Sequence, residues 1–190
     1  MKHSPPLGRR EARKADRRRI ILDVAERSFV ERGFADTSMS TIAAELGGSK
    51  TTLWSYFPSK DALFAAVVDS KIESFQAALD EALIATGGTA VVLSRFGCLF
   101  LNKITSASSS ALHRLVVAEC ERFPQIGEAF AIRGPDRVRA RLCRYMEEEM
   151  AAGRLRKGDA LLAARQFLAL CQAGFYLDRL WRPTDRKSVV

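Results

Sequence analysis

Hydrogen-bond donors cluster between residues 50 and 56, around a single apolar residue, Leu53. The donors are Lys50, Thr51, Thr52, Trp54, Ser55 and Tyr56. A helix over this stretch would carry polar groups on most of its faces, so it would make a poor core element. It suits the major groove of DNA, because small polar side chains on a narrow helix can reach base edges and phosphates there. These residues therefore predict hydrogen bonding to DNA.

Two short helices joined by a glycine turn would position these donors. The sequence TIAAEL at 41–46 predicts the first helix, and Gly47-Gly48 breaks it because glycine costs about 1 kcal/mol inside a helix. Ser49 is an N-cap candidate, since its hydroxyl can accept an orphan backbone N–H of the helix that follows. The pattern is that of a helix-turn-helix.

A further helix upstream would provide the apolar platform for this pair. Apolar residues recur at helical spacing between 17 and 32, and Gly33 ends the helix at a position where glycine is favoured. Phe34 is then expected to fold back into a small core. Three helices over residues 16–58 thus predict a small DNA-binding domain.

Composition supports a polyanionic partner. The 190 residues carry a formal net charge of +8 with a pI near 9.7, and eight of the Lys and Arg residues fall within residues 1–19. We expect residues 1–15 to be disordered, either as a solvated tail or as a basic arm that touches DNA. No apolar run approaches the roughly 18 residues of a membrane span, so a cytoplasmic protein is expected.

Signals of catalysis or metal binding are absent from the sequence. There is no glycine-rich phosphate loop, and Cys98, Cys120, Cys143 and Cys171 form no C-x-x-C pair. The two histidines lie far apart at positions 3 and 113. The run Glu147-Glu148-Glu149 is interpreted as a solvated helix face. We therefore expect no catalytic residues, no metal and no cofactor.

The rest of the chain also has helical periodicity, without strand-like alternation. A long helix is expected from Ser59 to about residue 85, because Ser59 can cap it and Asp61 favours its first turn. Further helices are expected up to residue 172 and beyond. The prediction is an all-α chain with a C-terminal helical bundle. Its expected parts are a disordered basic arm at 1–15, a DNA-binding domain at 16–58, a second helical domain at 59–182, and a loose tail at 183–190.

Residues 17–68 resemble the DNA-binding domain of TetR-type transcriptional regulators. The resemblance lies in the order AERSFVERGFADTSMSTIAAELGGSKTTLWSYFPSKDALFAAVV. The segments ERFPQIGEAF, GPDRVRARL, AAGRLRKGD and AARQFLAL resemble the C-terminal domain of AefR-like members. Two residues depart from the family pattern: Gly48 stands where valine is usual, and Trp54 stands where tyrosine is common.

The resemblance, with the spacing above, implies a set of DNA-binding residues. They are Thr37, Thr41, Ser49, Lys50, Thr51, Thr52, Trp54, Tyr56 and Lys60. Lys50, Thr51 and Thr52 begin the second helix of the pair, so they are the candidates for base edges. Resemblance assigns Thr37, Thr41, Trp54, Tyr56 and Lys60 to phosphates, which set the register of the protein on DNA. Packing within the domain is the alternative for Trp54 and Tyr56.

The resemblance also implies a homodimer with a ligand pocket, so residues 59–182 are expected to be a ligand-binding and dimerisation domain. Pocket candidates are Phe96, Phe100, His113, Phe130, Met146 and Gln166. Dimer-interface candidates are Phe167, Leu170, Phe175, Leu177 and Leu180, although core packing is an equal alternative for each. The expected function is a homodimeric repressor that a small apolar or aromatic effector releases from a palindromic operator. The alternative is a regulator of the same fold that works with a protein partner, or constitutively, without an effector.

Overall fold

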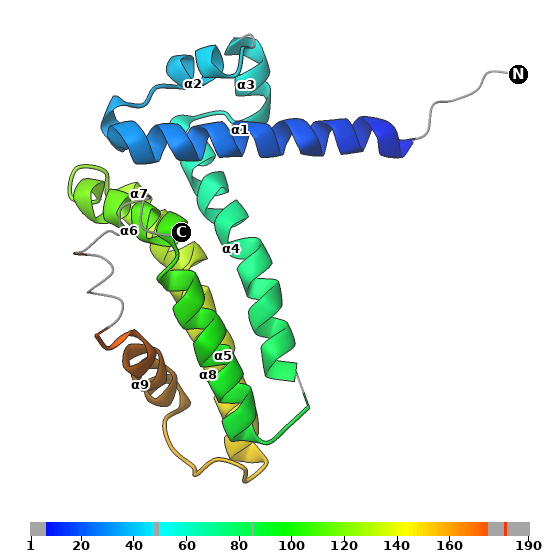
Figure 1. Ribbon diagram of the computed structural model, residues 1–190, viewed down its shortest axis with the longest axis vertical. Coiled ribbons are helices and arrows are strands. Elements are labelled where there is room, and N and C mark those ends of the chain that lie inside the picture. The colour runs from blue at the N-terminus through cyan, green and yellow to red at the C-terminus, as the bar shows by residue number, and fades with distance from the viewer. Residues whose placement is uncertain (1–6, 48–49, 85, 175–180, 182–190) are drawn as a thin grey trace, which may run out of the picture.

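The computed structural model describes residues 7–47, 50–84, 86–174 and 181, and every regular element in these ranges is a helix (Figure 1). The helices are α1 (Leu7–Asp36), α2 (Met39–Glu45), α3 (Lys50–Tyr56), α4 (Lys60–Ile84), α5 (Thr89–Ile104), α6 (Ala107–Glu119), α7 (Pro124–Arg133), α8 (Pro135–Ala151) and α9 (Ala160–Gln172). This confirms the predicted all-α fold. Among the described helices, none is long and apolar enough to cross a membrane.

Helices α1–α3 form a head, and α4–α9 form a body below it (Figure 1). Helix α1 packs on both α4 and α6, while α5 packs along α4 and α8 packs mainly against α9. One apolar core extends from Ile21 and Phe29 in the head through Phe64 in α4 to Leu115 in α6. A second core joins the lower part of α4 to α5, α8 and α9. The head therefore shares its core with the upper body, and packing continues across residue 58.

The prediction of a disordered arm at 1–15 is wrong for residues 7–15, which form the first turns of α1. Residues 1–6 lie outside the described part of the chain. The sequence REARKADRRR is rich in Arg, Lys, Ala and Glu, which are strong helix formers. A helix that is already nucleated on the core can extend through such residues at little cost. The basic segment is therefore a rigid continuation of α1.

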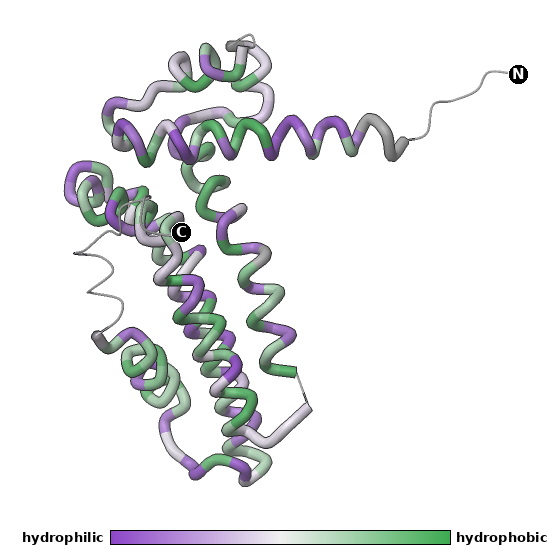
Figure 2. The backbone as a smooth tube through the Cα atoms, in the orientation of Figure 1, coloured by the Kyte–Doolittle hydropathy of each residue, from purple (hydrophilic) through white to green (hydrophobic). Residues whose placement is uncertain are grey.

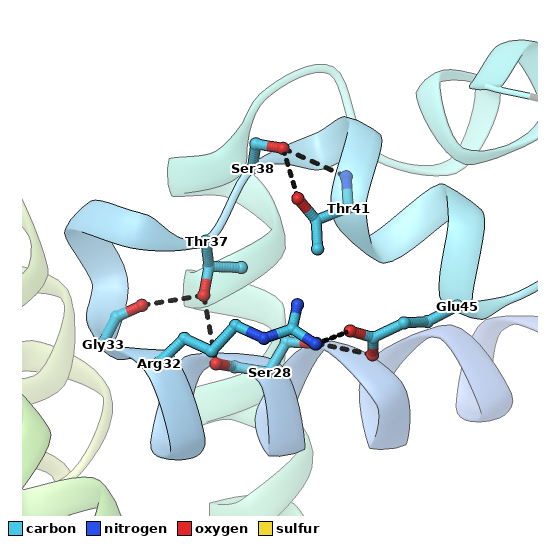
Figure 3. Close-up of polar contacts among 7 residues, drawn as sticks. All are labelled: Ser28, Arg32, Gly33, Thr37, Ser38, Thr41 and Glu45. Atoms are coloured by element: carbon cyan, nitrogen blue, oxygen red, sulfur yellow. Dashed lines mark hydrogen bonds and ion pairs between the residues drawn. The ribbon is translucent and has the colours of Figure 1, made fainter.

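The α1–α2 corner sets the orientation of the head (Figure 3). Gly33 has φ +85°, a conformation that favours glycine, and it turns the chain at the end of α1. Thr37 is 1% exposed, and its Oγ1 lies 3.0 Å from the Ser28 carbonyl oxygen and 2.7 Å from that of Gly33. The hydroxyl is thus used inside the corner, so the predicted phosphate contact of Thr37 is wrong.

A polar contact also holds α2 against α1 (Figure 3). The Ser28 hydroxyl donates to Glu45 Oε2 at 2.8 Å, and Arg32 Nη2 lies 2.5 Å from Glu45 Oε1. The hydrogen bond from Ser28, with the Arg32 guanidinium beside it, lowers the pKa of Glu45. Helix α2 therefore has a fixed position on the platform, and α3 packs against α2.

Glu149 lies at the end of the body far from the head, and its side chain is buried rather than solvated as predicted. Its side chain is 9% exposed and accepts hydrogen bonds from Thr89 Oγ1 at 2.5 Å and from Arg154 Nη2 at 2.7 Å. These bonds, Arg154 first, lower the pKa of Glu149 to about 2. The carboxylate thus ties the start of α5 to the turn after α8.

We predict that Thr37→Val destabilises the protein by about 2 kcal/mol, because two carbonyl oxygens in the corner lose a buried donor. Thr51→Val is the matched control, since Thr51 is exposed and an exposed site should change by less than about 0.5 kcal/mol. Urea unfolding followed by circular dichroism measures both changes. Equal stabilities for the two variants would contradict this role for Thr37.

We predict that Glu149→Gln costs about 3 kcal/mol at pH 7, because the pKa of Glu149 falls from 4.5 to about 2 on folding. A depressed pKa contributes stability that is complete above about pH 4.5 and is lost as the pH falls toward 2. The gap between wild type and variant should therefore close over that window. Glu148→Gln, on the exposed side of α8, is the control. A gap that stays constant from pH 7 to pH 2.5 would refute the assignment.

Candidate nucleic-acid interface

Helix α3 lies in the head, on the side of α1 away from the body (Figure 1). Leu53 and Phe57 are 2% and 4% exposed, and they anchor the helix in the head core. Thr51 is exposed, Trp54 is 42% exposed and Thr52 is half-buried. The apolar side of α3 thus packs inward and a polar side remains open, as a helix that reads DNA requires. The Lys50 side chain and Ser49 lie outside the described part of the chain.

The start of α2 presents a second pair of hydroxyls (Figure 3). Ser38 is the N-cap, and its Oγ accepts the Thr41 backbone N–H at 3.0 Å. The two hydroxyl oxygens lie 2.8 Å apart, with Ser38 exposed and Thr41 half-buried. Thr41 was predicted from the sequence, but Ser38 was missed. The signal for Ser38 was a serine directly before the apolar residues of a short helix.

Lys60, which was predicted to contact a phosphate, instead binds the α1 corner. Its Nζ donates to the Phe34 carbonyl oxygen at 2.7 Å and lies 4.3 Å from the centroid of the Phe34 ring. The ammonium therefore caps carbonyl groups at the end of the α1 corner, where a positive charge is favourable. This geometry contradicts a phosphate contact for Lys60.

The basic extension of α1 adds charge next to α3. Helix α1 extends well past the rest of the head, and its outer part is mostly hydrophilic (Figure 2). Arg13 and Lys14 are exposed, and with Glu11 they border a shallow groove against half-buried Tyr56 at the end of α3. The Arg18 guanidinium lies 5.4 Å from the ring centroid of Phe57. Cations of α1 thus flank the candidate recognition helix.

Half of the predicted pocket residues meet at one cavity in the body. A cavity of about 250 Å³ lies between α4, α5, α6, α7 and α8, and its lining includes Phe100, His113 and Phe130. Burial, followed by the charge of Arg114, lowers the pKa of His113, so its ring is neutral near pH 7. The ring centroids of His113 and Phe130 lie 5.9 Å apart.

The other three predicted pocket residues lie elsewhere. Phe96 is fully buried and packs on Phe167, at 6.2 Å between ring centroids. Met146 belongs to the same lower core, one turn along α8 from Leu142. Gln166 is exposed on α9. Phe96 and Met146 lie on helices that line the cavity, but their side chains pack in the second core. The side chain of Gln166 faces solvent.

Helix α9 carries several apolar side chains that are exposed on the surface of the body. Leu161, Leu162 and Leu170 are exposed, with Leu170 at 75%. Phe167, predicted for a dimer interface, instead packs partly into its own core. Phe175, Leu177 and Leu180 lie outside the described residues. Of the dimer candidates that can be placed, only Leu170 is freely exposed.

The described residues contain no group of three or more His, Cys, Asp or Glu side chains that could hold a metal. The arrangement therefore offers hydrogen-bond donors and positive charge around α3, and a partly open, mainly apolar cavity in the body.

Two known sequence signatures match the chain. The signature described as bacterial regulatory proteins, tetR family, matches residues 21–67. That of the AefR-like transcriptional repressor, C-terminal domain, matches residues 91–188, just over half of the chain. Both were expected from the sequence.

Similar proteins agree with these matches. The solved structure of a flavonoid-responsive regulator, FrrA, is 32% identical and has a TM-score of 0.76, with 92% of this chain and 88% of that chain covered. A TetR-family regulator from Mesorhizobium loti is 25% identical over 93% of this chain and 89% of its own, with a TM-score of 0.75. The regulator EthR of Mycolicibacterium smegmatis is 36% identical over 80 residues, which span 41% of this chain and only 37% of EthR.

Members of this family are DNA-binding regulators rather than enzymes. The helix-turn-helix head, the family signatures over both parts of the chain and the likeness to FrrA over its length lead to one conclusion. The chain belongs to the TetR family of bacterial transcriptional regulators, with an AefR-like C-terminal domain.

Proposed function

We propose that this regulator is a homodimeric repressor that binds a palindromic operator in the bacterial cytoplasm and leaves it when a small effector enters the body. The observation that carries the proposal is the polar side of α3, held open on a well-packed head by Leu53 and Phe57. A helix anchored in this way can enter the major groove without exposing the core. The match to AefR-like repressors supports repression over activation.

We assign base readout to the first residues of α3. Lys50, Thr51 and Thr52 begin that helix, where side chains of a recognition helix reach base edges. Ser49, the N-cap candidate of the sequence, completes the DNA-contacting set in this proposal. Thr41, Trp54 and Tyr56 act on phosphates, and Ser38 joins them because its hydroxyl is exposed beside Thr41.

The α1 extension supplies further phosphate contacts in this proposal. Arg13 and Lys14 are exposed and rigidly held beside the end of α3. A helix loses less conformational entropy on binding than a disordered arm, so its charges act at a fixed distance from the operator. Thr37 and Lys60 contribute through the corner of the head instead.

We propose that α9 forms part of the dimer interface. Its exposed leucines, Leu161, Leu162 and Leu170, offer an apolar surface that a second copy can bury. Two recognition helices on one face of DNA must lie about 34–36 Å apart, or a multiple of it, so a dimer sets the spacing of the half-sites. We keep residues 16–58 as the DNA-binding unit and assign ligand binding and dimerisation to 59–182.

The cavity favours an effector over the constitutive alternative. A filled core behind Phe96 and Phe100 would support a regulator without a ligand. Phe96 is indeed packed, but Phe100 borders the open volume of about 250 Å³. The name of FrrA, a flavonoid-responsive regulator, suggests a ligand with aromatic rings. The effector releases DNA only if it binds the DNA-incompetent arrangement more tightly than the competent one.

We predict that the double variant Arg13→Gln/Lys14→Gln lowers the magnitude of the slope of log K against log salt by about 3.6, because a dimer loses four phosphate contacts and each removes roughly 0.9. Lys60→Met should leave the slope unchanged, since its ammonium is bound to the α1 corner. Fluorescence anisotropy with the intergenic DNA beside the gene, from 50 to 200 mM salt, gives the slopes. A slope that falls by about 1.8 in Lys60→Met, which changes two residues per dimer, but not in the double variant, would reverse these assignments.

A further inference from the structure

The cavity in the body has apolar walls and positive charge. Its walls include Ile72, Phe75, Phe100, Leu112, Phe130 and Val138. Lys71 and Lys103 are the charged residues among the described lining, and both are cations. The lining thus combines a rounded apolar surface with ammonium groups on one side, which suits a small molecule that has an apolar body and an anionic group.

The Lys103 side chain lines the cavity and forms no ion pair among the described residues. Its Nζ donates to the Lys71 carbonyl oxygen at 2.7 Å and lies 5.7 Å from the centroid of the Phe75 ring. In the described part of the chain, no carboxylate lies within ion-pair distance of it. Burial and the neighbouring Lys71 lower the pKa of Lys103. The charged form of Lys103 therefore carries a desolvation cost, which pairing with an anion would offset.

Lys71 is already paired, and its partner belongs to the DNA-binding head. Lys71 Nζ lies 2.5 Å from Glu26 Oε2, and the Ser108 hydroxyl donates to Glu26 Oε1 at 2.9 Å. Lys71 and Ser108 both line the cavity, in α4 and α6, whereas Glu26 lies in α1. One carboxylate of the head therefore contacts two cavity-lining residues.

We propose that the cavity binds a small aromatic or aliphatic carboxylic acid whose carboxylate pairs with Lys103 and competes with Glu26 for Lys71. Lys71 is paired with Glu26 and Lys103 has no ion-paired carboxylate, so a carboxylate on the ligand would balance the second ammonium charge. The acid also weakens the contact that ties α1 to α4 and α6. This inference rests on the proposed effector-controlled function, for which it names the class of effector and the contact through which the effector acts.

The volume limits the size of the acid. About 250 Å³ is at the lower end of what small-molecule sites provide, so the apolar part should be one or two rings or a short alkyl chain. The three aromatic side chains of the wall, Phe75, Phe100 and Phe130, favour a flat ring system. A neutral molecule of the same shape would fill the walls but leave Lys103 without an anion.

Isothermal titration calorimetry on the full chain tests the charge preference with matched probes: 2-naphthoate against 2-naphthamide, and octanoate against octanamide. We expect at least one acid to bind about 10- to 100-fold more tightly than its amide. Lys103→Met should abolish that preference while it keeps the affinity for the amide. Lys157→Met, an exposed position in the loop before α9, should behave as wild type. Equal affinities for acid and amide, binding of no probe, or an unchanged preference in Lys103→Met would overturn the proposal.

The role of Glu26 is tested in the same preparations with the intergenic DNA. In wild type, we expect the binding acid to weaken DNA binding by about 5-fold or more. In Glu26→Gln, the acid should bind at least as tightly, because its competitor is gone, but it should change DNA affinity by less than 2-fold. An undiminished effect in Glu26→Gln would overturn the relay. If the unliganded wild type did not bind the DNA, the proposed regulatory function would be refuted. The affinities for acid and amide from calorimetry would still decide the class of ligand.

Discussion

The turn at Gly33 and Phe34 is the constraint on which the head depends. Gly33, at φ +85°, kinks α1 before its last three residues and turns Phe34 into the core. The centroid of the Phe34 ring lies 5.6 Å from that of Phe29 and 5.1 Å from that of Phe123. Glu119 of α6 accepts the Ala35 N–H at 3.1 Å, so the corner is bonded to the body as well as packed on it. The direction of α2, and with it that of α3, follows from this one turn because the chain leaves it in a fixed position.

In the proposed function, the shared core is the route from the cavity to the DNA-binding head. The head rests on α4 and α6, and these same helices line the cavity. Close-packed helices move as units, so a small displacement of α4 or α6 on ligand binding must be followed by α1 or opposed by its contacts. Glu26, Glu119 and Lys60 make polar contacts between α1 and the body that such a displacement would change. Regulation in this account is therefore a competition for contacts of α1.

The helices and the recognition segment could be predicted from the sequence because their signals are local. Apolar spacing, glycine breaks and serine caps identify them within a few residues. The inward orientation of Thr37, Lys60 and Glu149 could not be predicted, since their partners are carbonyls and side chains that only the fold brings near. Phe96 and Phe100 both pack in the second core from α5, yet only Phe100 also lines the cavity. Which of them meets a ligand depends on the neighbouring helices.

The central claim is that two copies of α3 read a palindromic site. Hydroxyl-radical footprinting of the intergenic DNA beside the gene tests it most directly. The account predicts two protected half-sites on one face of the DNA, about 10–10.5 base pairs apart or a multiple of it. It also predicts that Lys50→Ala loses discrimination at one base pair in each half-site while the flanking phosphate protection remains. A single unpaired footprint, or protection that Lys50→Ala reduces evenly across the whole site, would contradict it.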